Sequence, residues 1–238
     1  MHKFTTLLFL VISFSSFSQE RATLQRLQED KKICKTFAEK SIHEISDGVL
    51  LVRLNFHQKQ IDYLNKRDES VSAKSIEDKA LITNKKIAES FLKQFDFCTV
   101  YFFKMSDSKH VSLQEFDSIT LYDRNLNAVA VDSIRVKSDN YLIGEFNKIK
   151  QDTAYYYGDD VIDWSNENPR TKVYYGGAKN GREAFIIMDR KFQQLQRPFP
   201  YFSSLPSMLS ERVRYIKAIE QINLKLHSYS SQVGTKEE

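Results

Sequence analysis

The chain has 238 residues, with 35 Lys and Arg against 31 Asp and Glu, and a formal net charge of +4. It is rich in aromatic residues (17 Phe, 12 Tyr) and poor in Gly and Pro (7 and 4), which excludes a disordered or collagen-like chain. Lysines and acids alternate along the sequence instead of forming a basic stripe, so we expect no nucleic-acid partner.

Residues 1–18 are predicted to be a cleavable secretory signal peptide. Lys3 precedes an apolar run over residues 4–14, and Ser16 and Ser18 place small side chains at −3 and −1 before Gln19. The run is shorter than the ~20 residues that cross a bilayer, and no later stretch is apolar enough to form a second span. No Cys follows it to carry a lipid. We therefore expect a soluble exported chain, periplasmic or secreted after cleavage near Ser18-Gln19.

The absence of an Asn-x-Ser/Thr sequon favours a bacterial envelope over a glycosylating secretory route. The length remaining after cleavage is that of one ordinary domain, so residues 19–238 are predicted to form a single globular α/β domain.

The first half of this domain is predicted to contain a βαβ unit. Apolar residues at helical spacing indicate an amphipathic helix that ends at about residue 45, before Asp47-Gly48. We then expect a buried strand at 49–54, a short helix or turn at 57–67, a helix at 75–95 and a strand at 99–103. The long crossover predicts that the two strands lie parallel, with a right-handed connection.

Beyond residue 105 the pattern changes to short strands separated by polar turns, which predicts an antiparallel meander that extends the sheet. The expected strands are 119–122, 141–144, 153–157, 173–175 and 184–188, with a hairpin signal at Asn180-Gly181. Segment 197–202 holds two prolines and is expected at a sheet edge. A C-terminal helix from about Pro206 is expected to pack on the sheet.

These elements predict a mixed α/β (α+β) fold. Its parts are a central mixed sheet with an N-terminal βαβ unit, an antiparallel meander in the second half, and flanking N- and C-terminal helices.

Two segments, 121–126 and 187–192, share the order strand, Asp, Arg, polar, apolar. A short Asp side chain accepts hydrogen bonds from backbone amides ahead of it, so Asp123 and Asp189 are expected to organise two similar turns.

The two cysteines, Cys34 and Cys98, lie far apart and outside any Cys-x-x-Cys pattern, which excludes thioredoxin-type redox chemistry and Cys-based zinc sites. An exported protein permits a disulfide between them. Such a bond would stabilise the fold by about 4 kcal/mol in the chain-entropy model. The alternative is that both are buried small apolar side chains, since Cys98 lies in the apolar run 95–103.

No catalytic residue is predicted. Ser106-x-x-Lys109 and Ser138-Asp139-Asn140 match two motifs of serine β-lactamases and penicillin-binding proteins. The third motif, Lys-Thr-Gly, is missing, and Ser106 follows a strand instead of opening a long helix. There is no Gly-x-Ser-x-Gly elbow, no His-Glu-x-x-His pair and no glycine-rich phosphate loop, so we expect no metal and no cofactor.

Segment 155–169 carries the most distinctive chemistry, with a tyrosine cluster, the single Trp and three aspartates. Carboxylate and amide oxygens suit Ca²⁺, although the spacing of a preformed calcium loop is absent. Aromatic rings beside acids and amides suit a sugar or a peptide. The candidate ligand-binding residues are Tyr155, Tyr157, Asp159, Asp160, Asp163 and Trp164. The alternative is an acidic surface loop anchored by its aromatic rings.

The leading functional hypothesis is therefore a non-catalytic interaction or accessory subunit that binds an envelope protein. A ligand-binding module that uses segment 155–169 is the alternative, and a hydrolase with a dispersed site is the third. The sequence leaves the oligomeric state open.

Overall fold

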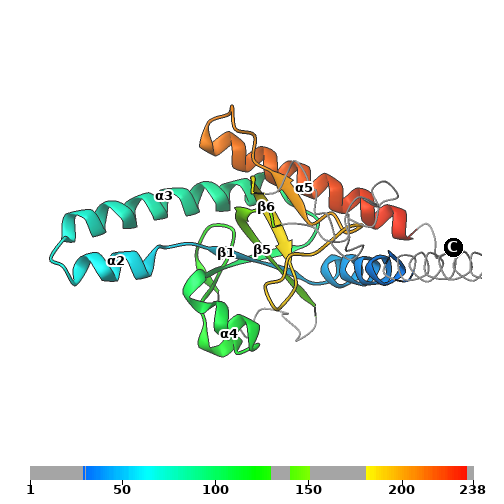
Figure 1. Ribbon diagram of the computed structural model, residues 1–238, viewed down its shortest axis with the longest axis horizontal. Helices are drawn as coiled ribbons and strands as arrows, with labels where there is room; N and C mark the ends of the chain where they lie inside the picture. Colours follow the sequence, from blue (N-terminus) through cyan, green and yellow to red (C-terminus); the bar gives the residue numbers. More distant parts are fainter. Residues whose placement is uncertain (1–28, 30, 130–139, 151–180, 235–238) are drawn as a thin grey trace, which may run out of the picture.

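The computed structural model describes residues 29, 31–129, 140–150 and 181–234. Within them, seven strands form one open mixed sheet in the order β4-β3-β2-β1-β5-β6-β7, with helices against it (Figure 1). The predicted α/β fold class is confirmed.

The strands are β1 (Val49–Leu54), β2 (Thr99–Lys104), β3 (Leu121–Tyr122), β4 (Ala128–Val129), β5 (Tyr141–Lys148), β6 (Glu183–Met188) and β7 (Phe202–Ser204). The helices are an N-terminal helix described over 31–46, α2 (Gln58–Asn65), α3 (Ser70–Gln94), α4 (Ser108–Ser112) and α5 (Glu211–Gly234). Single 3₁₀ turns, η1 (Met105–Asp107) and η2 (Phe116–Ser118), flank α4.

The βαβ unit lies at the centre of the sheet. β1 pairs in parallel with β2, Val49 opposite Thr99, and the crossover between them is the α2–α3 helical hairpin. β1 also pairs in parallel with β5, Val49 opposite Tyr141, on its other side. The chain therefore moves from β1 to one neighbour and later returns to the opposite neighbour.

The second half extends the sheet at both edges. The β3–β4 hairpin lies beyond β2, whereas β5, β6 and β7 form an antiparallel meander on the other side of β1. The expected edge segment leads into β7, the last strand of that side. The strands predicted at 153–157 and 173–175, and Asn180 of the hairpin signal, lie outside the described residues.

Two helix starts differ from their predictions. α3 begins at Ser70, before the predicted start, because Ala73 already packs in the helix and is buried. α5 begins at Glu211 instead of near Pro206. The Leu205 amide donates to the Glu183 carbonyl, which continues the β7 ladder and keeps the chain extended up to the proline.

The two faces of the sheet are covered by different helices. On one face the Phe91 ring of α3 lies 5.6 Å from Phe102 and 5.3 Å from Phe185, and α5 packs beside α3. On the opposite face the Tyr141 hydroxyl donates to the Val111 carbonyl of α4 at 3.0 Å. Figure 1 shows α3 and α5 on one side of the sheet, and α4 and the N-terminal helix on the other.

The two predicted Asp turns are confirmed. Asp123 Oδ1 accepts from the amides of Asn125 and Asn127, both at 2.8 Å. Asp189 Oδ1 accepts from the equivalent amides of Lys191 and Gln193 at 2.9 and 2.8 Å. In each turn the apolar residue that follows has a left-handed backbone, φ 63° at Leu126 and 61° at Phe192.

Candidate functional site

The six candidate ligand-binding residues of segment 155–169 lie outside the described residues, so that site stays a prediction. Of the β-lactamase-like motifs, Ser106 lies in η1, where its hydroxyl donates to Asp107 at 2.8 Å. The helix that follows, α4, has five residues, so Ser106 has the strand-to-loop context that was expected.

A polar cleft of about 520 Å³ opens where the parallel strands β1 and β5 end. Its floor comes from the carboxyl ends of these two strands, and one wall comes from α3. The lining residues used below are Arg53, Asn55, Lys79, Glu145, Phe146 and Tyr215.

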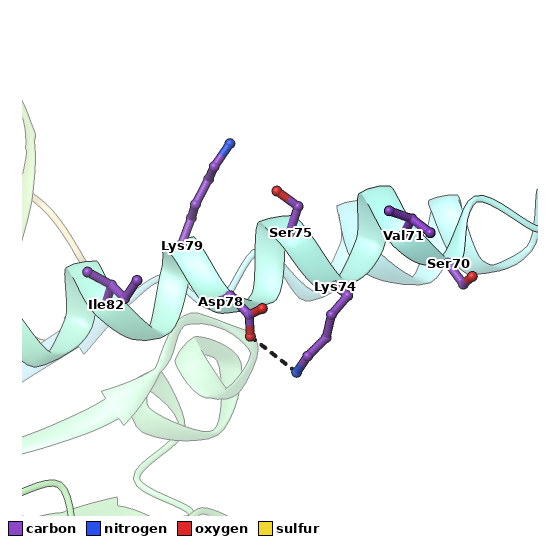
Figure 2. Close-up of a pocket in the computed structure, with 7 residues that line it drawn as sticks. All are labelled: Ser70, Val71, Lys74, Ser75, Asp78, Lys79 and Ile82. Carbon is purple, nitrogen blue, oxygen red and sulfur yellow. Dashed lines mark ion pairs between the residues drawn. The ribbon is translucent and has the colours of Figure 1, made fainter.

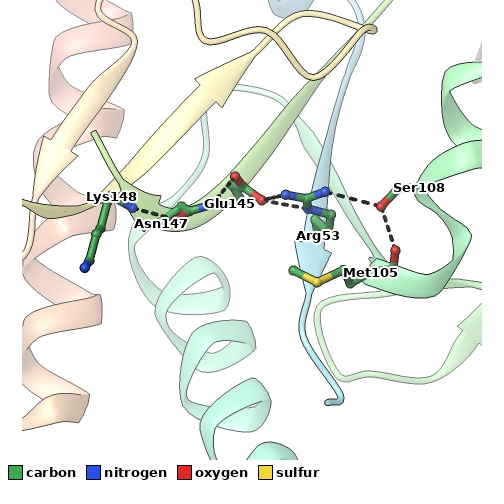
Figure 3. Close-up of polar contacts among 6 residues, drawn as sticks. All are labelled: Arg53, Met105, Ser108, Glu145, Asn147 and Lys148. Atoms are coloured by element: carbon green, nitrogen blue, oxygen red, sulfur yellow. Dashed lines mark hydrogen bonds and ion pairs between the residues drawn. The ribbon is translucent and has the colours of Figure 1, made fainter. Parts of the chain in front are cut away.

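An ion pair forms the floor of this cleft (Figure 3). Arg53 Nε donates to Glu145 Oε2 at 2.6 Å, and a second guanidinium nitrogen donates to the same oxygen. Asn147 Nδ2 donates to the other carboxylate oxygen, Oε1, at 2.8 Å. Arg53 Nη1 also reaches Ser108 Oγ at 3.4 Å, and the guanidinium lies 5.0 Å from the Phe192 ring centroid. Both charges are therefore neutralised and hydrogen-bonded, as groups with little exposure require.

Two asparagines fix α3 against the end of β1. Asn84 is buried on α3, and its Nδ2 donates to the Asn55 carbonyl at 3.1 Å. Asn55 Oδ1 accepts from the His57 amide at 2.8 Å, and His57 turns the chain into α2 with φ 53°. The wall and the floor of the cleft are thus joined by the hydrogen bond from the Asn84 side chain.

Tyr215 of α5 closes the rim of the cleft. Its hydroxyl donates to Glu211 Oε1 at 3.3 Å. Burial and the Glu211 charge raise the pKa of Tyr215 to about 12, while the hydrogen bond from Lys86 holds the pKa of Glu211 below its usual value. Tyr215 is therefore a neutral phenol near neutral pH.

Two histidines form ion pairs outside the cleft. His110 pairs with Glu115 at 2.7 Å near α4. His227 of α5 pairs with Asp96 at 2.8 Å. Asn223 Oδ1 accepts hydrogen bonds from the backbone amides of Asp96 and Phe97, which follow α3. The cluster of His227, Asn223 and Asp96 therefore joins α5 to the end of α3. Its side chains are exposed and do not surround a cleft, so we read it as structural.

No group of three or more His, Cys, Asp or Glu is arranged to hold a metal ion among the residues described. Likewise, none of the described helices combines the length and the apolar character that crossing a membrane requires.

The possible disulfide between Cys34 and Cys98 is not formed in the structure. Cys98 is buried directly before β2, and this burial raises the pKa of its thiol to about 12. Cys34 is half-buried on the N-terminal helix. The alternative, a buried apolar side chain, is confirmed for Cys98 and is wrong for Cys34.

A second surface feature lies on the outer half of α3. A shallow groove of about 620 Å³ runs along one face of this helix. Figure 2 shows the side chains that line it. Val71 and Ile82 lie at its two ends, 85% and 52% exposed. Between them Lys74 pairs with Glu77 at 2.9 Å and with Asp78 at 3.2 Å. The periodicity of residues 75–95 predicted the buried face of this helix but did not single out the exposed one.

Comparison of the chain with protein-family models, with curated proteins and with solved structures gives no match.

Proposed function

We propose that this protein is an exported, non-catalytic interaction subunit. We propose further that it binds an envelope protein through the groove on the outer half of α3, which Val71 and Ile82 line. The observation that carries the proposal is the hairpin itself. α2 packs against α3, and the two helices project beyond the sheet with exposed apolar side chains (Figure 1).

The arrangement of the groove supports a protein partner. Val71 and Ile82 are three helical turns apart, a spacing that places them on one face of α3. Exposed apolar side chains that share a face, with charged neighbours around them, are typical of interaction sites. The projecting position leaves this face accessible to a partner without disturbing the sheet.

Affinity capture from an envelope extract tests the proposal. The wild type is compared with the double variant Val71→Ser/Ile82→Ser, and Leu224→Ser serves as a matched control because Leu224 is equally apolar and 63% exposed on α5. We expect one envelope protein to be retained by the wild type and the control and lost by the double variant, and the purified pair to re-form the complex. Identical capture by all three proteins, or none by the wild type, would overturn the proposal.

The alternative function is ligand binding by segment 155–169, and it is supported by the aromatic and acidic composition of that segment alone. It is tested through Trp164, the single Trp of the chain, whose fluorescence reports directly on that segment. A saturable change with a glycan, a peptide or Ca²⁺ would favour this alternative, and an unchanged spectrum across all three would count against it.

A further inference from the structure

We infer that the cleft at the carboxyl ends of β1 and β5 binds a small organic carboxylate with an apolar body. The cleft lies at the edge of the sheet and the groove lies along the outer half of α3, and Lys79 is the residue that lines both among those described. The inference goes beyond the proposed function because it concerns a small molecule and not a protein partner.

The position of the cleft in the topology is the first argument. In open α/β sheets, ligands bind outside the carboxyl ends of the parallel strands, at the point where the strand order reverses. Here the order β2-β1-β5 reverses at β1. The cleft floor is made by Arg53 at the end of β1 and by Glu145 of β5, which follows the last residue that pairs with β1, Gly144. The crossover after β1 runs over one face, and η1 and α4 after β2 lie toward the other (Figure 1).

The size and walls of the cleft suit a small molecule with an apolar part. Its volume of about 520 Å³ falls within the usual range of small-molecule sites. Ile76, Ala80 and Ile87 of α3 line one wall. The half-buried rings of Phe146 and Tyr215 line the other, with centroids 4.8 Å apart and nearly perpendicular. Edge-to-face rings of this kind present an apolar surface to a bound ring or chain.

The charge balance of the lining selects an anion. Glu145 is the sole acid among the lining residues that the structure describes, and both of its oxygens already accept hydrogen bonds, from Arg53 and Asn147. Arg53 is neutralised in the same pair. Besides His57, Lys79 is the remaining basic residue among the described lining residues, and the adjacent Asp78 pairs with Lys74 instead. The described lining therefore carries one lysine charge that no lining acid neutralises, and the amide side chains of Asn55 and Gln60 line the cleft as well.

A single lysine with neutral amide donors fits a carboxylate better than a phosphate group. Phosphate sites usually combine several cations with backbone amides at a glycine-rich turn. Among the described lining residues Arg53 is already paired with Glu145, and none is a glycine. A cation would meet Lys79 and no available carboxylate.

Titration of the ¹⁵N-labelled protein with 3-phenylpropionate, followed by NMR, tests the inference. We expect saturable shifts of the backbone amides of Asn55, Ala80 and Asn147. The neutral 3-phenylpropionamide and the cationic 3-phenylpropylamine should bind at least about tenfold more weakly, a difference of about 1.4 kcal/mol. Lys79→Gln should lose the preference for the acid, whereas Lys85→Gln, on the exposed side of the same helix and outside the cleft, should retain it.

The variant spectra also report whether each protein is folded. The double variant Val71→Ser/Ile82→Ser should bind 3-phenylpropionate normally, which separates this site from the proposed partner surface. Absence of saturable shifts at the cleft amides, or equal binding of the acid, the amide and the amine, would overturn the inference.

Discussion

The guanidinium of Arg53 is held by the carboxylate of Glu145 across two adjacent parallel strands, although the residues are 92 positions apart in the chain. Both side chains are largely shielded, at 17% and 8% exposure. Each charge therefore depends on the other, because removing one leaves its partner desolvated without compensation.

A double-mutant cycle measures this dependence. Arg53→Met and Glu145→Gln should each lower the free energy of unfolding by about 3 kcal/mol. The double variant should lose clearly less than the sum, with a coupling of at least about 1 kcal/mol. Urea denaturation of the four proteins gives the values, and strictly additive losses would show that the two charges act independently.

Gly144 makes room for an aromatic ring. A Cβ at this position would overlap Cζ of Phe185, which is fully buried between Phe91 and Phe146 and has no space to move. Gly144→Ala should therefore lower the free energy of unfolding by about 1–3 kcal/mol. Gly234→Ala is the control, because no atom lies within 4 Å of the added Cβ, and its effect should stay within about 0.5 kcal/mol. Equal midpoints for the two variants in thermal or urea unfolding would contradict this reading.

The Asp123 turn should respond to acid. Partial burial of the carboxyl raises its pKa, but the amides of Asn127 and Asn125 outweigh it, so the pKa of Asp123 lies below its usual value. A carboxyl with a lowered pKa in the folded state stabilises the fold fully above the unfolded value of 3.8, and this contribution is lost as the pH falls through the folded value. The wild type should thus exceed Asp123→Asn in stability at pH 7, and the difference should shrink below about pH 4. A difference that is constant from pH 7 to pH 2.5 would argue against it.

The two cysteines should differ in reactivity. Because Cys98 is buried with its thiol pKa raised to about 12, it should resist alkylation in the native protein at pH 8, whereas half-buried Cys34 should react faster. In denaturant without a reductant, both thiols should then be titratable. If neither thiol reacted until a reductant was added, the two would be bonded to each other after all.

The export signal is tested by cleavage. The protein recovered from a secreting host should begin at Gln19, since Ser16 and Ser18 offer the small side chains that the peptidase requires. Ser18→Phe should block processing, whereas Ser15→Phe, outside the two recognised positions, should be cleaved normally. N-terminal sequencing distinguishes these outcomes, and a start at Met1 in all three proteins would remove the basis for an exported function.

Features that depend on neighbouring residues were predictable from the sequence. The run at 49–54 became β1 with the predicted bounds, because consecutive β-branched and aliphatic residues favour a strand wherever it is placed. The turns at Asp123 and Asp189 were equally local, since a carboxylate and the amides it accepts are two and four residues apart. Even so, the left-handed backbone at Leu126 and Phe192 carries no sequence signal, because neither residue is the Gly or Asn that usually adopts it.

The tertiary structure alone decided what lies at the candidate site. The parallel pairing of β5 with β1 brings Glu145 to Arg53, and the α3 crossover brings Lys79 and Asn84 to the same edge. Such contacts depend on which strands become neighbours, a choice made by the burial of whole faces and not by any local pattern. The sequence determined the fold class, and it predicts export. The order of the strands determined that the Arg53–Glu145 ion pair, the hydrogen bond from Asn84 to Asn55 and the Lys79 side chain belong to one cleft.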